Sequence, residues 1–169
     1  MKRLMIVVVV GLLLSGCSSD APSTDASVTA KPSVKLRSGF TVGVYTIEPY
    51  ANLRYAVLFG EDLSNAALPY ADLSNADLLG ADLRYANLSG ADLGFADLRG
   101  ANLANAQLVG ADLGFADLSN ANLQSADLKD ANLRGANLTN ANLTNAYLND
   151  ADLTDATMPD GWRDRVAAY

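Results

Sequence analysis

Hydrophobic residues follow a period of five through most of the chain. A leucine returns at every fifth position from Leu53 to Leu153, and Met158 takes the next such position. Alanine stands two places before each of these residues, except where Glu61 replaces it. A strand repeats every two residues and a surface helix every 3.6, so a period of five fits neither element.

The five-residue unit predicts one side of a larger coil. Alanine and leucine, two positions apart, point to the same side of an extended segment. The other three positions are rich in Asp, Asn, Gly and Ser, which are turn-forming residues. A unit this short cannot bury its leucine alone, so successive units must stack on one another. We therefore predict a solenoid over residues 51–160, with leucine and alanine inside.

Both ends of this array need to be closed. Residues 40–50, FTVGVYTIEPY, alternate partly between apolar and polar and predict a short capping strand. Residues 161–169 contain Trp162 and Val166 four positions apart, which predicts a short capping helix with Trp162 over the last coil. The alternative for this segment is a dimer contact. Glu61 falls at an inward position, so we expect the coil to be open or distorted there.

The N-terminal residues have the pattern of a targeting signal. Lys2 and Arg3 precede an apolar run from Leu4 to Leu14 that is too short to span a bilayer comfortably. This run has the length of a signal-peptide core, and we predict a signal peptide over residues 1–16. The sequence that ends at Cys17, LSGC, resembles a bacterial lipobox.

The lipobox resemblance implies cleavage before Cys17 and acylation of that cysteine. An uncleaved anchor with an incidental cysteine is the alternative. Residues 17–39 are rich in Ser, Thr, Ala, Pro and Asp and cannot bury enough surface to offset the entropy of ordering, so we expect a flexible tether. Ser18, rather than Asp, follows the cysteine, which in lipoproteins of the enteric type implies sorting to the outer membrane.

Composition narrows the functional classes. The 169 residues suggest one domain, and the net charge of −7 argues against nucleic-acid binding through phosphate neutralisation. There is no histidine, and the single cysteine excludes an internal disulfide. The sequence contains no metal-ligand set, phosphate-binding loop or nucleophile motif. We therefore expect no enzyme, no cofactor and no metal site.

The repeats resemble the pentapeptide repeat family, whose motif is written A(D/N)LXX. The resemblance covers residues 51–160 and implies an all-β solenoid, a right-handed quadrilateral β-helix with four repeats per coil. Residues 20 apart would then lie above one another.

That register predicts columns of aspartate, one of them begun by Asp62 and Asp82, and two others that form the candidate acidic face. Of these two, the first contains Asp72, Asp92 and Asp112, and the second contains Asp77, Asp97 and Asp117. One interpretation is that each carboxylate accepts hydrogen bonds from the turn, as Asp and Asn commonly do. The other is an acidic face that binds a cationic partner.

Outward apolar residues form two further candidate contacts. Phe95 and Phe115 are 20 apart, as are Phe59 and Leu79, beside Val57. The first pair is interpreted either as a ladder tolerated at a corner or as part of a partner site. The second is interpreted either as a surface covered by the 40–50 strand or as an exposed patch, which would mark a partner site.

Two functions follow. The first is a lipoprotein of the bacterial cell envelope, anchored through Cys17, whose rigid acidic rod is a scaffold or binding module for an unidentified protein. Its location would be the outer membrane in a Gram-negative host, and a homodimer through the C-terminal end is a further possibility. The alternative is a DNA-mimicking gyrase-binding protein, as implied by the resemblance to the quinolone-resistance pentapeptide proteins. The acidic rod suits that alternative, and the signal peptide opposes it.

Overall fold

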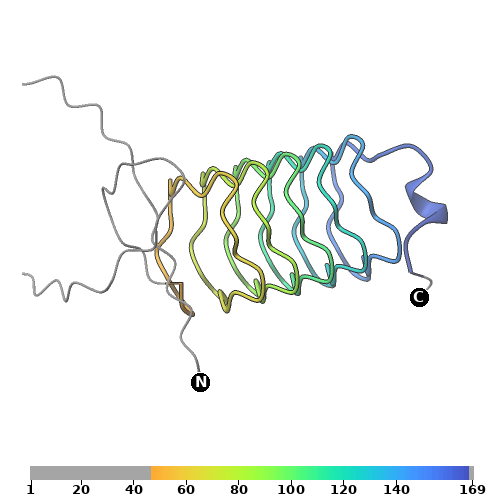
Figure 1. Cartoon of the computed structure of the whole chain (residues 1–169). Helices are drawn as coiled ribbons and strands as arrows, with labels where there is room; N and C mark the ends of the chain where they lie inside the picture. Colours follow the sequence, from red (N-terminus) through yellow and green to blue (C-terminus); the bar gives the residue numbers. More distant parts are fainter. Residues whose placement is uncertain (1–46, 168–169) are drawn as a thin grey trace, which may run out of the picture.

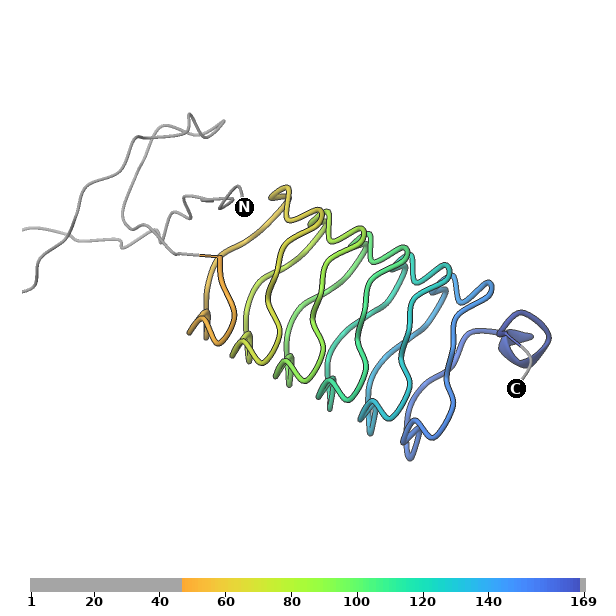
Figure 2. The same cartoon turned by 90° about the horizontal axis from the view of Figure 1, so that it is seen from below.

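A rod of stacked coils is the architecture of the chain. The computed structural model describes residues 47–167, which wind into successive coils of similar size (Figure 1). A second view shows the same stacking, with the C-terminal 3-10 turn η1 (Trp162–Asp164) beyond the last coil (Figure 2).

Four pentapeptides make one coil. Parallel bridges join each residue before a leucine position to the residue 20 positions later, from Asn52↔Asp72 to Asn137↔Thr157. Each contact uses regular backbone hydrogen bonds: the Leu53 N–H donates to the Asp72 carbonyl at 2.7 Å, and the Asp72 N–H donates to the Ala51 carbonyl at 2.9 Å. The β-structure of residues 47–167 consists of these single bridges, which confirms the expected spacing of 20.

A tight turn at each corner explains the polar residues of the repeat. The Ala56 N–H donates to the Leu53 carbonyl at 3.0 Å, which closes a four-residue turn. The third residue of such a turn has a positive φ, 58° at Tyr55 and 64° at Gly60. This left-handed region favours Gly and, among other residues, Asn and Asp. The array also places aromatic residues there, including Phe95 with φ 59°.

The core is a continuous stack of leucine and alanine. Every leucine of the repeat from Leu53 to Leu143 is fully buried, and Leu148 is 3% exposed. Leu153 and Met158 are partly buried because they lie in the last coil, where one side has fewer neighbours. A slip of one residue would move leucine into water and Asp or Asn into this core, which is why the period is kept so strictly.

At the N-terminal end, the described part of the expected capping strand is a turn. Residues 48–50 adopt the corner geometry of the array: the Ala51 N–H donates to the Glu48 carbonyl at 3.2 Å, and Tyr50 has a φ of 62°. Pro49 stands at the second position of this turn, which suits its fixed φ. Ile47 is buried against the first coil. Residues 40–46 lie outside the described residues.

The prediction of an open or distorted coil at Glu61 is wrong. The Glu61 N–H donates to the Leu58 carbonyl at 3.1 Å, and the Asp82 N–H donates to the Glu61 carbonyl at 2.9 Å, as at regular positions. Glu61 belongs to the first coil, and its side chain is only partly buried there. That partial burial raises the pKa of its carboxyl group without disturbing the backbone.

At the C-terminal end, the expected capping helix over residues 161–169 is reduced to one 3-10 turn. η1 follows Gly161, which has a φ of 62°, and Trp162 packs against the core. The repeat then resumes: Val166, 20 positions after Ala146, also packs against the core, and the Ala167 N–H donates to the Ala146 carbonyl at 2.9 Å. Only one side of the coil is therefore free to become helical. Residues 168–169 lie outside the described part.

The square cross-section gives the rod four faces. Face 1 contains residues 51–55 and each segment 20 residues farther on, and faces 2, 3 and 4 begin in the same way at residues 56, 61 and 66. Within each segment we call the residue before the leucine the Asx position. The two residues after the leucine are the first and second outer positions.

Candidate interaction surface

Carboxylates and amides at the Asx position hold the turns. Every Asp or Asn there accepts, through Oδ1, a hydrogen bond from the backbone N–H at the first outer position. The Gly94 N–H to Asp92 distance is 2.9 Å, and the Gly114 N–H to Asp112 distance is 2.8 Å. All six aspartates of the candidate acidic face have this structural role. Because it uses only Oδ1, it leaves the second carboxylate oxygen available.

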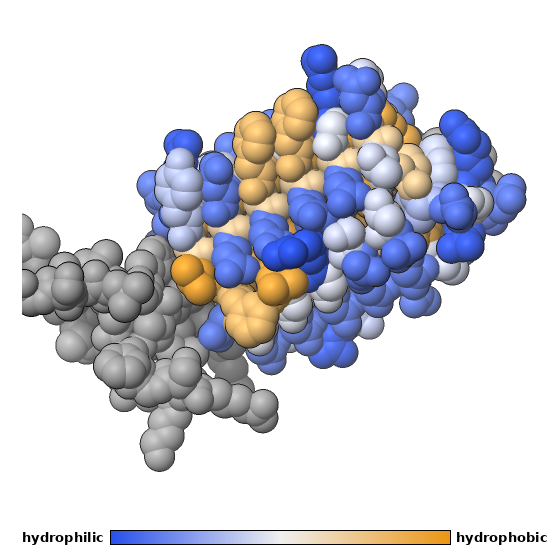
Figure 3. Space-filling model, turned by 90° about the horizontal axis from the view of Figure 1, so that it is seen from above, coloured by the Kyte–Doolittle hydropathy of each residue, from blue (hydrophilic) through white to orange (hydrophobic). Residues whose placement is uncertain are grey.

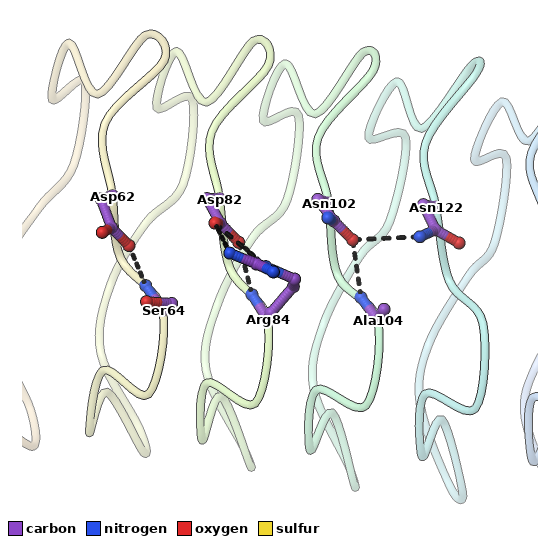
Figure 4. A network of polar contacts seen from close by, with 7 residues as sticks. All are labelled: Asp62, Ser64, Asp82, Arg84, Asn102, Ala104 and Asn122. Atoms are coloured by element: carbon purple, nitrogen blue, oxygen red, sulfur yellow. Dashed lines mark hydrogen bonds and ion pairs between the residues drawn. The ribbon is translucent and has the colours of Figure 1, made fainter.

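Ion pairs neutralise some of these carboxylates and not others. On face 2, Arg99 bonds Asp97 through Nε to Oδ1 at 2.8 Å and through Nη2 to Oδ2 at 2.6 Å. The hydrogen bonds from Arg99 lower the pKa of Asp97. On face 3, Arg84 holds Asp82 in the same way, and Figure 4 shows its side chain folded back over that carboxylate.

Face 1 lacks such compensation. Its column of Asp72, Asp92 and Asp112 contains none of the partners of the ion pairs found in residues 47–167, which involve Asp82, Asp97 and Asp130. Of the two columns of the candidate acidic face, the one on face 1 therefore forms no ion pair within the described part of the chain, and the guanidinium of Arg54, which lines the same face, lies over the Tyr55 ring instead.

Asparagine replaces aspartate toward the C-terminal end and adds bonds between coils. The Asn132 Nδ2 donates to Asp112 Oδ1 at 2.8 Å, and the Asn122 Nδ2 donates to Asn102 Oδ1 at 3.1 Å (Figure 4). Two stacked carboxylates cannot form this bond, since neither has a proton to donate. Aspartate at consecutive coils is thus a weaker structural choice than asparagine.

Aromatic residues stack at two corners, as the spacing of 20 predicts. The rings of Phe95 and Phe115 lie 5.2 Å apart between centroids at 10°, while both side chains remain exposed. Each ring leans toward the next coil, and the ladder ends where that coil offers a glycine. A Cβ at Gly135 would lie 2.6 Å from the Phe115 ring, closer than atoms can approach. Tyr50 and Tyr70 form a second ladder, with centroids 5.3 Å apart.

A shallow groove on face 1 brings the acidic and aromatic features together. It measures about 380 Å³ and is lined by Arg54, Tyr55, Ser74, Asn75, Asp92, Gly94 and Phe95. Asp92 and Phe95, which the sequence analysis assigned to separate candidate surfaces, therefore belong to one. Arg54 and Gly94 were missed. The signal was available, because the first outer column of face 1 has arginine at residues 54 and 134 and only Ser or Gly at 74, 94 and 114.

A second apolar surface lies on face 2 near the N-terminal end. Val57 is 42% exposed, Phe59 is 60% exposed and Leu79 is partly buried. Apolar side chains gather in two places on the side of the rod shown in Figure 3. Coverage by a strand from residues 40–50 remains a prediction, since residues 40–46 are outside the described part.

The described part of the rod offers neither a metal cluster nor a membrane-spanning helix. Within residues 47–167, no three His, Cys, Asp or Glu side chains gather closely enough to hold a metal ion. Among the same residues, no helix is sufficiently long and apolar to cross a bilayer. Cys17, the predicted acylation site, lies outside the described residues.

The coil geometry of the rod is also found in proteins of known structure. Several solved structures of pentapeptide repeat proteins are similar to this chain, among them two with TM-scores above 0.5. One is the pentapeptide repeat protein Rfr23 from the cyanobacterium Cyanothece 51142, with 38% identity, 54% of this chain and 61% of that one covered, and a TM-score of 0.52. The other is a pentapeptide repeat protein of the Arabidopsis thaliana thylakoid lumen, with 35% identity, 63% and 74% covered, and a TM-score of 0.55.

The plasmid-mediated fluoroquinolone resistance protein QnrB1 also matches, at 21% identity over 64% of this chain and 69% of that one. Its TM-score of 0.25 carries no functional information. None of the curated proteins matches this chain. The profile of the family described as Pentapeptide repeats matches residues 50–84, 62–94, 86–124 and 121–158. With its coils of four pentapeptides and more than half its length matched, the chain belongs to the pentapeptide repeat family.

Proposed function

We propose that the protein is a lipoprotein of the bacterial cell envelope whose rod is a non-enzymatic binding module. The observation that carries the proposal is the N-terminal sequence MKRLMIVVVVGLLLSGC, with a basic start, a short apolar run and small residues before Cys17. Two or more acyl chains anchor a protein stably, whereas a single chain gives only marginal binding. The rod would then stand on the membrane at the end of the 17–39 tether.

The surface of the rod supports binding rather than catalysis. Catalytic sites are concave and mostly enclosed, whereas the groove on face 1 is shallow and open. The chain has no histidine for proton transfer. The stacked rings of Phe95 and Phe115 are exposed at 64% and 57%, which is an apolar surface that a partner can cover.

The anchor is tested in the protein's own host by the mass of the N-terminal peptide and by membrane fractionation. The wild type is expected to begin at an acylated Cys17 and to remain with the membrane, the outer one in a Gram-negative host. Cys17→Ser should abolish both cleavage and acylation, whereas the control Ser19→Ala should leave both unchanged. A wild-type chain that begins at Met1 and is found in the soluble fraction would overturn the proposal.

Gyrase binding by DNA mimicry is the second candidate, favoured by the net charge of −7 and by the acidic column of face 1, which forms no ion pair within residues 47–167. Gyrase binding requires a cytoplasmic protein, and the predicted signal peptide over residues 1–16 argues against that location. Inhibition of gyrase supercoiling by the purified chain, together with a cytoplasmic location, would favour this candidate over the anchored module.

A further inference from the structure

We propose that the middle of face 1 binds arginine side chains presented by a protein partner, with Asp92 and Asp112 as the acceptors. The proposal rests on the binding-module function and names the chemistry of the partner. It depends on three features of the rod. They are the residue type at the first outer position of each face, the absence of ion pairs in the face 1 column among the described residues, and the stacked rings of Phe95 and Phe115 beside that column.

The rod itself shows how a guanidinium fits beside an Asx-position carboxylate. On faces 2 and 3, the first outer residues Arg99 and Arg84 fold back onto Asp97 and Asp82, and each Nη2 reaches a carboxylate oxygen at 2.6 Å. The Nε of the same guanidinium bonds the same carboxylate at 2.8 Å, so each pair is held by two nitrogens. Such forked contacts are stronger and more specific than single bonds.

On face 1 the same place is left open. The first outer residues beside Asp92 and Asp112 are Gly94 and Gly114, which have no side chain to occupy it. Within 4 Å, a Cβ at Gly94 would meet only Asp92 Oδ1, at 3.1 Å, and the Gly114 carbonyl oxygen, at 3.8 Å. Beside Asp92 an external guanidinium can therefore take the position that Arg84 and Arg99 occupy on the other faces. Asp112 Oδ1 already accepts a hydrogen bond from Asn132 Nδ2, so Asp112 offers its Oδ2.

The aromatic corner of face 1 distinguishes arginine from lysine. Phe95 and Phe115 stand next to this opening, and on the same column the Arg54 guanidinium already lies over the Tyr55 ring, 5.1 Å from its centroid. A planar guanidinium can stack on such a ring while it bonds a carboxylate, whereas an ammonium group cannot form the forked pair.

The spacing of the acceptors favours a helical segment as the occupant. Stacked strands lie about 4.8 Å apart, so Asp92 and Asp112, in adjacent coils, repeat at this interval. Residues four apart on a helix have Cβ atoms roughly 5–6 Å apart. A partner helix with arginines at such positions presents them at nearly the spacing of the coils, and its positive charge complements a column whose carboxylates form no ion pair within residues 47–167.

The test uses the chain from residue 18 onward and a labelled alanine-based helical peptide with two arginines four positions apart, measured by fluorescence anisotropy at low salt. The same peptide with lysines is the second probe. We expect the arginine peptide to bind at least fivefold more tightly. The double variant Asp92→Asn/Asp112→Asn should lose at least tenfold in affinity, while Asp77→Asn/Asp117→Asn, which removes the same charge from face 2, should lose less than threefold.

A second pair of variants fills the opening from within. Gly94→Arg/Gly114→Arg should abolish peptide binding, because these arginines can fold onto Asp92 and Asp112 as Arg84 does onto Asp82. Neither glycine has a left-handed φ, so an arginine can adopt the backbone once the Asx-position Oδ1 shifts slightly, since a Cβ would lie 3.1 Å from it at Gly94 and 3.0 Å at Gly114. Ser119→Arg/Thr139→Arg adds the same charge on face 2 and should lose less than threefold in affinity. Thermal unfolding of all variants verifies that the rod is intact.

Equal losses in the face 1 and face 2 aspartate variants, or no preference for arginine, would overturn the proposal. A gain in affinity when Lys31, Lys35 and Arg37 are changed to Gln would also overturn it, since the chain's own basic segment would then be the occupant. The assay needs no membrane, so a failed anchor and a failed arginine site give different results.

Discussion

Replacing Asp92 by Asn should stabilise the rod. Asp92 lies between Asp72 and Asp112 in a column where each carboxylate uses Oδ1 for the turn. Asparagine keeps that acceptor, because Asn132 accepts the Arg134 N–H at 3.0 Å. Its Nδ2 can also donate to Asp72 in the previous coil, as Asn132 does to Asp112 at 2.8 Å.

The magnitude follows from the repulsion that is removed. Two unit charges about 4.8 Å apart repel by about 0.9 kcal/mol in water, and Asp92 has two such neighbours. A Debye length of about 8 Å at 0.15 M salt reduces the total to about 1 kcal/mol, and at 1 M it falls to about 0.3 kcal/mol. We therefore expect a gain of about 1 kcal/mol in the free energy of unfolding at 0.15 M, most of which is lost at high salt.

Urea unfolding followed by circular dichroism, at three salt concentrations, measures this gain. Asp97→Asn is the matched control, because Asp97 also has two stacked aspartate neighbours but is paired with Arg99. It should gain less or lose stability. A destabilised Asp92→Asn, or a gain that does not shrink with salt, would refute the reasoning about the column.

Three further perturbations test the fold. Leu98→Ala removes a fully buried side chain and should cost about 2–5 kcal/mol in urea unfolding, whereas Leu153→Ala, in the partly buried last coil, should cost less; equal costs would contradict a continuous core. Gly135→Ala should destabilise more than Gly110→Ala in thermal melts: both have a left-handed φ, but only Gly135 has the Phe115 ring against it, so similar losses would argue against the ladder. Glu61→Gln should raise stability at pH 7 and have little effect below about pH 4. Its pKa is raised in the folded state, so the folded chain binds more protons than the unfolded one just above the usual pKa, and stability falls as pH rises through that window. A melting temperature unchanged by Glu61→Gln at pH 7 would contradict this sign.

Much of the rod could be predicted from the sequence because every pentapeptide has the same pattern of buried and exposed positions. Leucine and alanine at fixed places identify the inside, and the stacking of Phe95 on Phe115 follows once the coil length is known. That length came from the family resemblance, since a period of five is equally compatible with triangular or square coils. The bridges at a spacing of 20 now establish it.

The ends were predicted less well, because there the sequence pattern and the backbone register separate. Residues 47–50 lack the motif but keep its turn, and Val166 keeps the register after a 3-10 excursion. Glu61 was expected to distort the coil because burial of a carboxylate is costly. In the outermost coil its side chain stays partly exposed, so the backbone has no reason to change.

The groove on face 1 was missed for a different reason. The acidic column and the aromatic pair could each be predicted from the sequence, but a groove between them also requires residues without bulky side chains. Gly94 lies in that groove, and a glycine in a repeat is interpreted as a turn residue unless its column is compared with those of Arg99 on face 2 and Arg84 on face 3.

Because one coil contains 20 residues, a short insertion moves all later residues to a different face of the rod. Duplication of one pentapeptide after residue 90 would leave every leucine inside, yet it would turn all downstream residues by one face. Asp72 would then no longer stand in line with Asp92 and Asp112. Duplication of four pentapeptides would instead lengthen the rod and restore each column. Genetic changes that the core cannot distinguish can therefore dismantle or preserve a surface, so the evolution of binding in such a rod is governed by repeat number modulo four.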